Sequence, residues 1–231
     1  MGRLVLWDID RTLVDIGGIS REIYAAAYAE VTGQPLVHMP RLAGRTDHDL
    51  ILDSLAMHGV PAPERYVEPF YDALTAATRL RRADIERHGR ALPGAREAID
   101  ALAAIPGLVQ TVVTGNVRPV AELKLQAFGL AGPIDFDIGG YGSDDSDRAH
   151  LVRMALERAH RKHGTPTPTD HAVVIGDTPH DIAGAHANGI RAIAVATGTF
   201  PAETLTAAEA VLTSLQDTGA LLHLVLESLH P

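Results

Sequence analysis

The sequence repeats one pattern, in which a short apolar run stops abruptly at polar or glycine residues and a helical pattern follows. The first run, residues 4–7, ends at Asp8. An apolar run without alternation is typical of a strand that is buried on both faces, as in a parallel sheet. Strands that alternate with helices predict a parallel α/β sheet with right-handed connections. We predict further strands at residues 109–113, 136–141, 172–175 and 192–196, and helices at 95–104, 119–128, 148–163 and 182–188.

One long stretch, residues 16–89, does not follow this alternation. It contains almost only helical patterns, with Ser20 and Asp47 as the expected N-caps. Leu92-Pro93-Gly94 then forms a turn after which the α/β pattern resumes. We therefore predict a core domain of residues 1–15 and 90–231, with a helical domain of residues 16–89 inserted after the first strand. The helical patterns inside the insertion are 20–32, 47–58 and 64–87, and a last helix is expected at 214–229.

The composition excludes several classes of function. The net charge of −9 disfavours nonspecific binding to nucleic acids or to anionic membranes. The chain has no cysteine, which excludes disulfides, thiolate metal sites and cysteine nucleophiles. No apolar run approaches the roughly 18 residues that a membrane helix needs, and the first ten residues do not have the form of a signal peptide. We expect a cytoplasmic protein without nucleic-acid or membrane partners, and the composition leaves the oligomeric state open.

Acidic residues follow two of the predicted strands at the points where these strands end. Asp8 and Asp10 follow the first strand, and Asp177 and Asp181 follow the strand at 172–175. Ligands of open parallel sheets bind beyond the carboxyl ends of the strands, so we expect these four side chains to converge. That much negative charge in one cleft is costly unless a cation binds there, and oxygen ligands suit Mg²⁺ better than zinc. The sequence therefore predicts a magnesium site.

The spacing of Asp8 and Asp10 lets both side chains face the cleft while Ile9 points into the core. One carboxylate can attack an electrophile, while the other, kept partly protonated by its anionic neighbour, can donate and recover a proton. Other groups at this edge can bind anionic oxygens or offset the charge of a phosphoryl group. They are Thr12, Thr114, the backbone amides of Gly115 and Asn116, and Lys124.

Three motifs in this order resemble the haloacid dehalogenase superfamily of phosphohydrolases. They are LVLWDIDRTLVD, VVTGN and VVIGDTPHDI. Gly44-Arg45-Thr46-Asp47 and Leu92-Pro93-Gly94 resemble the phosphoglycolate phosphatase-like branch. The resemblance implies a Rossmann-like core with an inserted α-helical cap of the C1 type. It also implies Mg²⁺-dependent hydrolysis of a small phosphate ester.

The resemblance also assigns roles to the motif residues. Asp8 corresponds to the nucleophile that forms an aspartyl-phosphate, and Asp10 to the acid/base whose backbone carbonyl is a Mg²⁺ ligand. Thr114 corresponds to the hydroxyl that binds phosphate. Asp177 corresponds to a metal ligand, and Asp181 supports the metal or a water beside it. Dehalogenases of the superfamily lack an acid at the position of Asp10, so carbon–halogen cleavage is disfavoured.

One family position is not filled in the usual way. The third motif is a lysine after the strand that here ends near Tyr141, but this chain has lysines only at positions 124 and 162. We expect Lys124 to fill this role, with Arg148 as the alternative, because arginine can clamp a phosphate through two hydrogen bonds. Arg45 in the insertion is a further candidate for contact with the substrate.

Two alternatives remain beside a phosphatase. A phosphomutase of the β-phosphoglucomutase type shares the first aspartates but returns the phosphoryl group to a sugar instead of to water. A non-catalytic binding protein on the same fold would be expected to lack Asp8, Asp10 or Asp177, and all three are present. The identity of the phosphate ester cannot be derived from the motifs, because the fold alone does not specify it.

Overall fold

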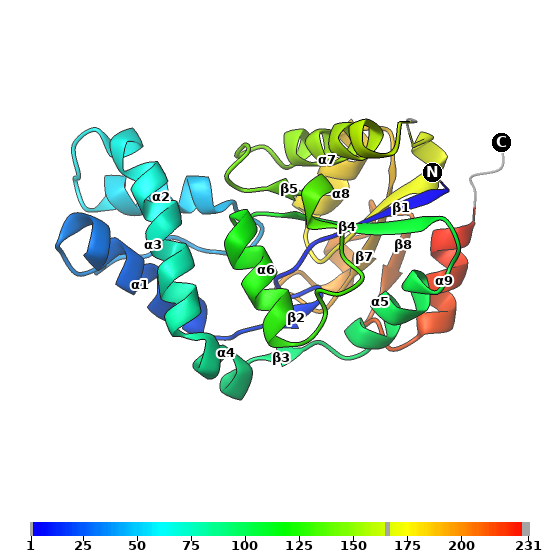
Figure 1. The fold of residues 1–231 in the computed structure, drawn as a ribbon, viewed down its shortest axis with the longest axis horizontal. Coiled ribbons are helices and arrows are strands. Elements are labelled where there is room, and N and C mark those ends of the chain that lie inside the picture. The colour runs from blue at the N-terminus through cyan, green and yellow to red at the C-terminus, as the bar shows by residue number, and fades with distance from the viewer. Residues whose placement is uncertain (1, 165–166, 228–231) are drawn as a thin grey trace.

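A six-stranded sheet lies at the centre of the larger part of the protein (Figure 1). The computed structural model describes residues 2–164 and 167–227. All neighbouring strands of the sheet are parallel, in the order β5-β4-β1-β6-β7-β8, so the predicted parallel α/β sheet is confirmed. The strands are β1 (Arg3–Trp7), β4 (Leu108–Thr114), β5 (Gly140–Tyr141), β6 (Ala172–Gly176), β7 (Arg191–Val195) and β8 (Ala210–Leu212).

The side chains of β1 alternate between two apolar layers. Val5 and Trp7 pack in one layer and Leu4 and Leu6 in the other, and all four are fully buried. Helices cover both faces of the sheet, which explains the unbroken apolar run of this strand. Within the described ranges, no helix is long and apolar enough to cross a membrane. The first layer includes α5 (Ala95–Ala103), α6 (Arg118–Ala127) and α9 (Thr218–Leu226), and the second α7 (Arg148–His163) and α8 (Pro179–Ala187).

Helices α1 to α4 lie to one side of the sheet and pack around an apolar cluster of their own (Figure 1). Tyr28 and Phe70 are fully buried in this cluster, and Val117 and Val120 join it from the region of α6. The chain enters and leaves the helical segment through a two-stranded antiparallel ribbon. The elements are β2 (Val14–Asp15), α1 (Ile19–Thr32), α2 (Asp47–Met57), α3 (Val67–Leu80), α4 (Arg82–His88) and β3 (Arg90–Ala91), with a short 3-10 helix at Pro63–Tyr66.

Local hydrogen bonds place several helix boundaries differently from the sequence prediction. Gly18, not Ser20, is the N-cap of α1. Thr46, not Asp47, is the N-cap of α2, since its hydroxyl accepts a hydrogen bond from the amide of Asp49 at 3.3 Å. The helix expected at 64–87 is divided at Arg81. At α2, a capping side chain therefore decides a boundary that apolar periodicity leaves open.

The shortest strands were the least predictable elements. Of the strand expected at 136–141 only Gly140–Tyr141 forms, and Phe136–Ile138 is a 3-10 helix. Strands β8, β2 and β3 were not predicted, because two or three residues carry no periodic signal. The helix expected at 214–229 begins only at Thr218, where Asp217 caps it, and ends at Leu226. Residues 228 and 229 lie outside the described residues.

The burial of β1 generates a stability prediction. Replacing Leu6, which is fully buried, by alanine leaves a cavity beneath α7 and α8. We expect Leu6→Ala to lower the free energy of unfolding by about 3 kcal/mol, measured by urea denaturation. Leu80→Ala is the matched control, because Leu80 is 85% exposed and its loss should cost less than about 0.5 kcal/mol. Equal losses for the two variants would contradict the assignment of Leu6 to the core.

Candidate active site

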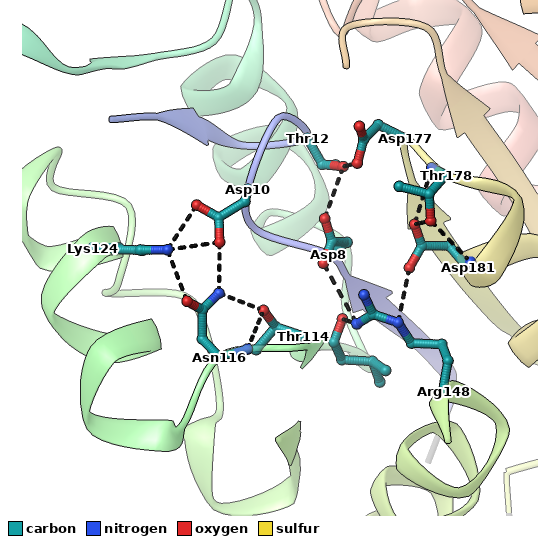
Figure 2. A network of polar contacts seen from close by, with 11 residues as sticks. Asp8, Asp10, Thr12, Thr114, Asn116, Lys124, Arg148, Asp177, Thr178 and Asp181 are labelled. Carbon is teal, nitrogen blue, oxygen red and sulfur yellow. Dashed lines mark hydrogen bonds and ion pairs between the residues drawn. The ribbon is translucent and has the colours of Figure 1, made fainter. Parts of the chain in front are cut away.

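The carboxyl ends of β1 and β6 bring together acidic residues that are far apart in the sequence (Figure 2). Asp8 follows β1, Asp177 follows β6, and Asp181 lies in the first turn of α8. One carboxylate oxygen of each lies within 4.8 Å of one of each of the others, and all three residues are buried. The predicted convergence of these three side chains is what the structure shows. Asp10 lies to one side of this cluster, toward Lys124 (Figure 2).

A tight turn after β1 presents both aspartates. The carbonyl of Ile9 accepts hydrogen bonds from the amides of Thr12, Leu13 and Val14 at 3.3, 2.9 and 3.0 Å. Arg11 adopts a positive φ of 67°, which reverses the chain within this turn. The hydroxyl of Thr12 lies 3.4 Å from a carboxylate oxygen of Asp8 and 3.4 Å from one of Asp177. Thr12 thus links the two acidic segments.

A capping box fixes the position of Asp181. Its Oδ2 accepts hydrogen bonds from the amide and the hydroxyl of Thr178, at 3.1 and 2.8 Å, while the Thr178 hydroxyl caps α8. The other oxygen, Oδ1, is buried and has no hydrogen-bond partner among the described residues. One side of this carboxylate therefore stabilises the helix, and the other faces the acidic cluster. The spacing Thr178-x-x-Asp181 is the signal that could have identified this box from the sequence.

Arg148 is the cation nearest to Asp8 in Figure 2. It is the first residue of α7, it is buried, and its Nη1 donates a hydrogen bond to the carbonyl of Val113 at 3.1 Å. Its guanidinium lies 3.6 Å from Oδ1 of Asp8 and 3.4 Å from Oδ1 of Asp181. The second contact is an ion pair whose atoms are not aligned for a hydrogen bond. Burial lowers the pKa of Arg148, but the carboxylates outweigh burial and raise it overall.

Lys124 contacts Asp10 instead of Asp8. Its Nζ lies 2.7 Å from both carboxylate oxygens of Asp10 and 2.7 Å from Oδ1 of Asn116. The side-chain amide of Asn116 donates to Asp10 at 2.7 Å and to the hydroxyl of Thr114 at 2.8 Å. Lys124 and Asn116 thus hold Asp10 beside the end of β4. Lys124, which the sequence analysis preferred for the third motif, and Arg148 occupy different positions in the site (Figure 2).

The two aspartates after β1 have opposite electrostatic environments. Burial, followed by the charges of Asp181 and Asp177, raises the pKa of Asp8 well above its usual value. Burial also raises the pKa of Asp10, but Lys124 and Asn116 outweigh it, so the net pKa of Asp10 is lowered. The expectation that an anionic neighbour keeps Asp10 partly protonated is therefore wrong, because the cation in contact has the larger effect.

The donor set fits a magnesium ion. Burial and the charges of Asp181 and Asp10 raise the pKa of Asp177 to about 7, so the ionised form of this carboxyl group is disfavoured unless a cation lies beside it. Arg148 supplies one positive charge against three carboxylates, and Oδ1 of Asp181 has no hydrogen-bond donor among the described residues. A Cβ at Gly198 would lie 1.6 Å from Oδ2 of Asp177, so only glycine leaves room there. Buried oxygen ligands with uncompensated charge are what Mg²⁺ requires.

The structure does not bring every candidate to this cluster. The guanidinium of Arg45 forms an ion pair with Asp53 at 2.7 Å on the outside of α2. Arg45 and Arg148 do line the same cavity of about 470 Å³, between the start of α2 and the start of α7. Asp144 pairs with Arg158, while Asp147 caps α7. The acidic stretch at 144–147 therefore has a structural explanation.

The comparisons with known proteins agree with this geometry. The model of the haloacid dehalogenase-like hydrolase family matches residues 5–186. No curated protein sequence matches the chain. Among solved structures, a hydrolase from Pseudomonas syringae is 21% identical with a TM-score of 0.66, covering 98% of this chain and 100% of that one.

Two further solved structures show the same fold. A predicted phosphatase from Clostridium acetobutylicum is 20% identical with a TM-score of 0.66, covering 96% of this chain and 99% of that one. CbbY from Rhodobacter sphaeroides, in complex with phosphate, is 16% identical with a TM-score of 0.62, covering 95% and 97%. Since the family model spans most of the sequence and includes the three acidic residues of the cluster, the chain belongs to the haloacid dehalogenase-like hydrolase family.

Proposed function

We propose that this hydrolase removes the phosphoryl group from a small phosphomonoester, with Asp8 as the nucleophile. The observation that carries this proposal is the position of Asp8 within the acidic cluster and beside the buried guanidinium of Arg148. An electrophile that is itself anionic needs cations around the attacking carboxylate, and Arg148 together with a cation held by the acidic cluster would supply them. The phosphate bound to CbbY agrees with an anion-binding site in this fold.

Mg²⁺ would be held by the carboxylates of Asp8 and Asp177 and by the backbone carbonyl of Asp10, with Asp181 beside it. When bound, the metal withdraws charge from the phosphoryl oxygens and lowers the repulsion between the phosphate and the carboxylate of Asp8. Arg148 and the hydroxyl of Thr12 orient Asp8, because both lie against its carboxylate.

The chain's own residues account for both halves of the reaction. A carboxylate oxygen of Asp8 forms a bond to phosphorus while the ester P–O bond breaks, and Asp10 gives its proton to the departing oxygen. In the second half, Asp10 takes a proton from water as the water oxygen attacks phosphorus, and the bond between phosphorus and Asp8 breaks. Inorganic phosphate is released, and both aspartates return to their starting states.

Lys124 sets the protonation state of Asp10. In the free protein its ammonium group favours the ionised carboxylate, which is the form that removes a proton from water. A phosphate dianion beside Asp10 opposes this effect and raises the fraction of the carboxylic acid, which is the form that protonates the leaving oxygen. We therefore assign the contact with the nucleophile and phosphate to Arg148 and the control of Asp10 to Lys124, the reverse of the preference from the sequence.

The remaining groups bind and enclose the substrate. The Thr114 hydroxyl and the backbone amide of Gly115 lie at the end of β4 and bind phosphoryl oxygens, while the backbone amide of Asn116 donates to the Thr114 hydroxyl and positions it. The helical segment, residues 16–89, acts as the cap that excludes water from the site, which limits the substrate to a small molecule. Arg45 lines the cavity next to Arg148, so its guanidinium can reach the part of the ester beyond the phosphate once its ion pair with Asp53 opens.

The nucleophile assignment is tested with Asp8→Asn. The amide keeps the shape of the side chain but is a far weaker nucleophile, so we expect the rate of p-nitrophenyl phosphate hydrolysis to fall by at least about 1,000-fold. The measurement is release of inorganic phosphate in the presence of Mg²⁺, with Asp100→Asn, an exposed aspartate on α5, as the matched control.

Activity of Asp8→Asn near the wild-type level would contradict the role of Asp8. The same assay with a panel of sugar phosphates separates the two reaction types. A phosphatase releases inorganic phosphate, whereas a mutase yields an isomerised sugar phosphate. Isomerisation without phosphate release would contradict the proposed hydrolysis.

The raised pKa of Asp177 predicts that Mg²⁺ binding depends on pH. With this pKa at about 7, the group is ionised above pH 7 and carries a proton below it. Mg²⁺ requires the carboxylate, so each binding event below pH 7 must release that proton. We expect the dissociation constant for Mg²⁺ to rise by up to roughly tenfold per pH unit below 7 as Asp177 becomes protonated.

Isothermal titration calorimetry at pH 6, 7 and 8 measures this constant and the number of protons released. The Asp177→Asn variant should bind Mg²⁺ more weakly and lose most of the pH dependence. Asp100→Asn again serves as the control, since Asp100 is exposed on α5. The same affinity at pH 6 and pH 8 for the wild type would contradict a raised pKa of Asp177 at the metal site, and wild-type affinity in Asp177→Asn would contradict its role as a ligand.

A further inference from the structure

Asp47 is a buried carboxylate that the proposed reaction does not use. It is the first residue of α2 and is 6% exposed. Its Oδ1 accepts a hydrogen bond from the hydroxyl of Tyr24 on α1, and its Oδ2 accepts one from the backbone amide of Val117 at 2.8 Å. The backbone amide of Asp47 donates to the carbonyl of Gly115 at 2.7 Å. Asp47 therefore ties α1 and α2 to the segment that follows β4.

Two glycines allow this contact to be so close. A Cβ at Gly115 would lie 2.2 Å from the carbonyl oxygen of Arg45, so a side chain there would push the start of α2 away. A Cβ at Gly142 would lie 1.8 Å from the carbonyl oxygen of Gly115 and 3.1 Å from the amide nitrogen of Asp47. Three backbone segments are thus in direct contact here. They are the start of α2 in the helical segment, the end of β4 and the loop that follows β5.

The segment that Asp47 holds, residues 114–117, also holds Asp10. Asn116 donates to Asp10 at 2.7 Å, and its backbone amide donates to the hydroxyl of Thr114 at 3.3 Å. The amide of Gly142 donates to the carbonyl of Asn116 at 3.0 Å. Any change in the position of Gly115 or Val117 would therefore be transmitted to the groups around Asp10.

The hydroxyl of Tyr24 is suited to hold Asp47 in this position. It is buried on α1, and burial together with the charge of Asp47 raises its pKa well above the usual value, so it remains a donor. The two aromatic rings of Tyr24 and Phe70 pack with their centroids 6.1 Å apart, which fixes the tyrosine within the helical segment. The hydroxyl of Tyr24 therefore orients the carboxylate of Asp47 so that its other oxygen accepts the hydrogen bond from the amide of Val117.

We propose that Asp47 is a positioning residue that links docking of the helical segment to the geometry of residues 114–117 and, through Asn116, to Asp10. This inference rests on the proposed function. When the helical segment is docked, Asp47 fixes the amide of Val117 and the carbonyl of Gly115, which places Thr114 and Asn116 for the reaction. When it is not docked, these bonds are absent and the site is incomplete, so turnover is restricted to the closed, water-excluding state.

The kinetic test compares Asp47→Ala with Asp47→Asn. Alanine removes both side-chain hydrogen bonds and leaves the buried amide of Val117 without its acceptor, so we expect kcat to fall by roughly 10- to 100-fold with a smaller change in KM. Asparagine keeps an oxygen for Val117 and offers an amide hydrogen to Tyr24, so it should restore most of kcat. The matched control is Asp72→Ala, because Asp72 is exposed on α3 and should be without effect.

The second test measures hydrogen exchange at residues 114–117 and needs no turnover. Exchange in this segment should be faster in Asp47→Ala than in the wild type, Asp47→Asn or Asp72→Ala, while β1 and β6 keep their protection. If the protein hydrolyses no phosphate ester but shows this exchange pattern, the proposed function fails and the positioning role of Asp47 stands.

Three results would overturn the inference. They are a folded Asp47→Ala variant with wild-type kcat and wild-type exchange, an Asp47→Asn variant as impaired as Asp47→Ala, and faster exchange throughout the sheet. If Asp47→Ala does not fold, Tyr24→Phe replaces it, because it removes only the hydroxyl that orients Asp47. We expect that variant to lower kcat several-fold and to speed exchange at Val117, and no change in either would equally overturn the inference.

Discussion

The cost of burying several carboxylates at one edge of a sheet determines how the rest of the site is built. Asp8, Asp177 and Asp181 lie within 4.8 Å of one another, and burial raises the pKa values of the first two. Arg148 offsets part of this charge from the start of α7, and the remaining negative charge fits a divalent cation. The capping box at Thr178 keeps Asp181 in place, so the arrangement is rigid even though its charges repel each other.

The same edge of the sheet gives different surroundings to two aspartates that are close together in the sequence. The turn at Ile9 directs Asp8 toward the acidic cluster and Arg148, and Asp10 toward Lys124 and Asn116. Two aspartates that are two residues apart thus have pKa values shifted in opposite directions. The nucleophile and the proton carrier that we propose need such different environments, and the fold supplies them from two different strand ends.

How much of this was predictable depended on the length and the chemistry of each segment. The parallel sheet followed from the apolar runs, because a strand covered on both faces is apolar over most of its length. Short elements such as β2 and β8 gave no signal, whereas the spacing of Thr178 and Asp181 carried a capping-box signal that the prediction did not use. The contacts of Lys124 and Arg148 were not predictable, because both are cations at helix positions and only the packing of α6 and α7 decides which aspartate each one meets.

By itself, the sequence determined the family, the parallel core and the acidic residues that converge at its edge. These follow from local patterns, and the carboxyl ends of parallel strands always lie on one side of a sheet. Only the tertiary structure decided that Asp10 is held ionised by Lys124, that Arg148 faces Asp8, and that Asp47 bonds to Val117 instead of capping its own helix. These interactions join segments about 70 to 140 residues apart, and no local pattern encodes which side chains will meet across such separations.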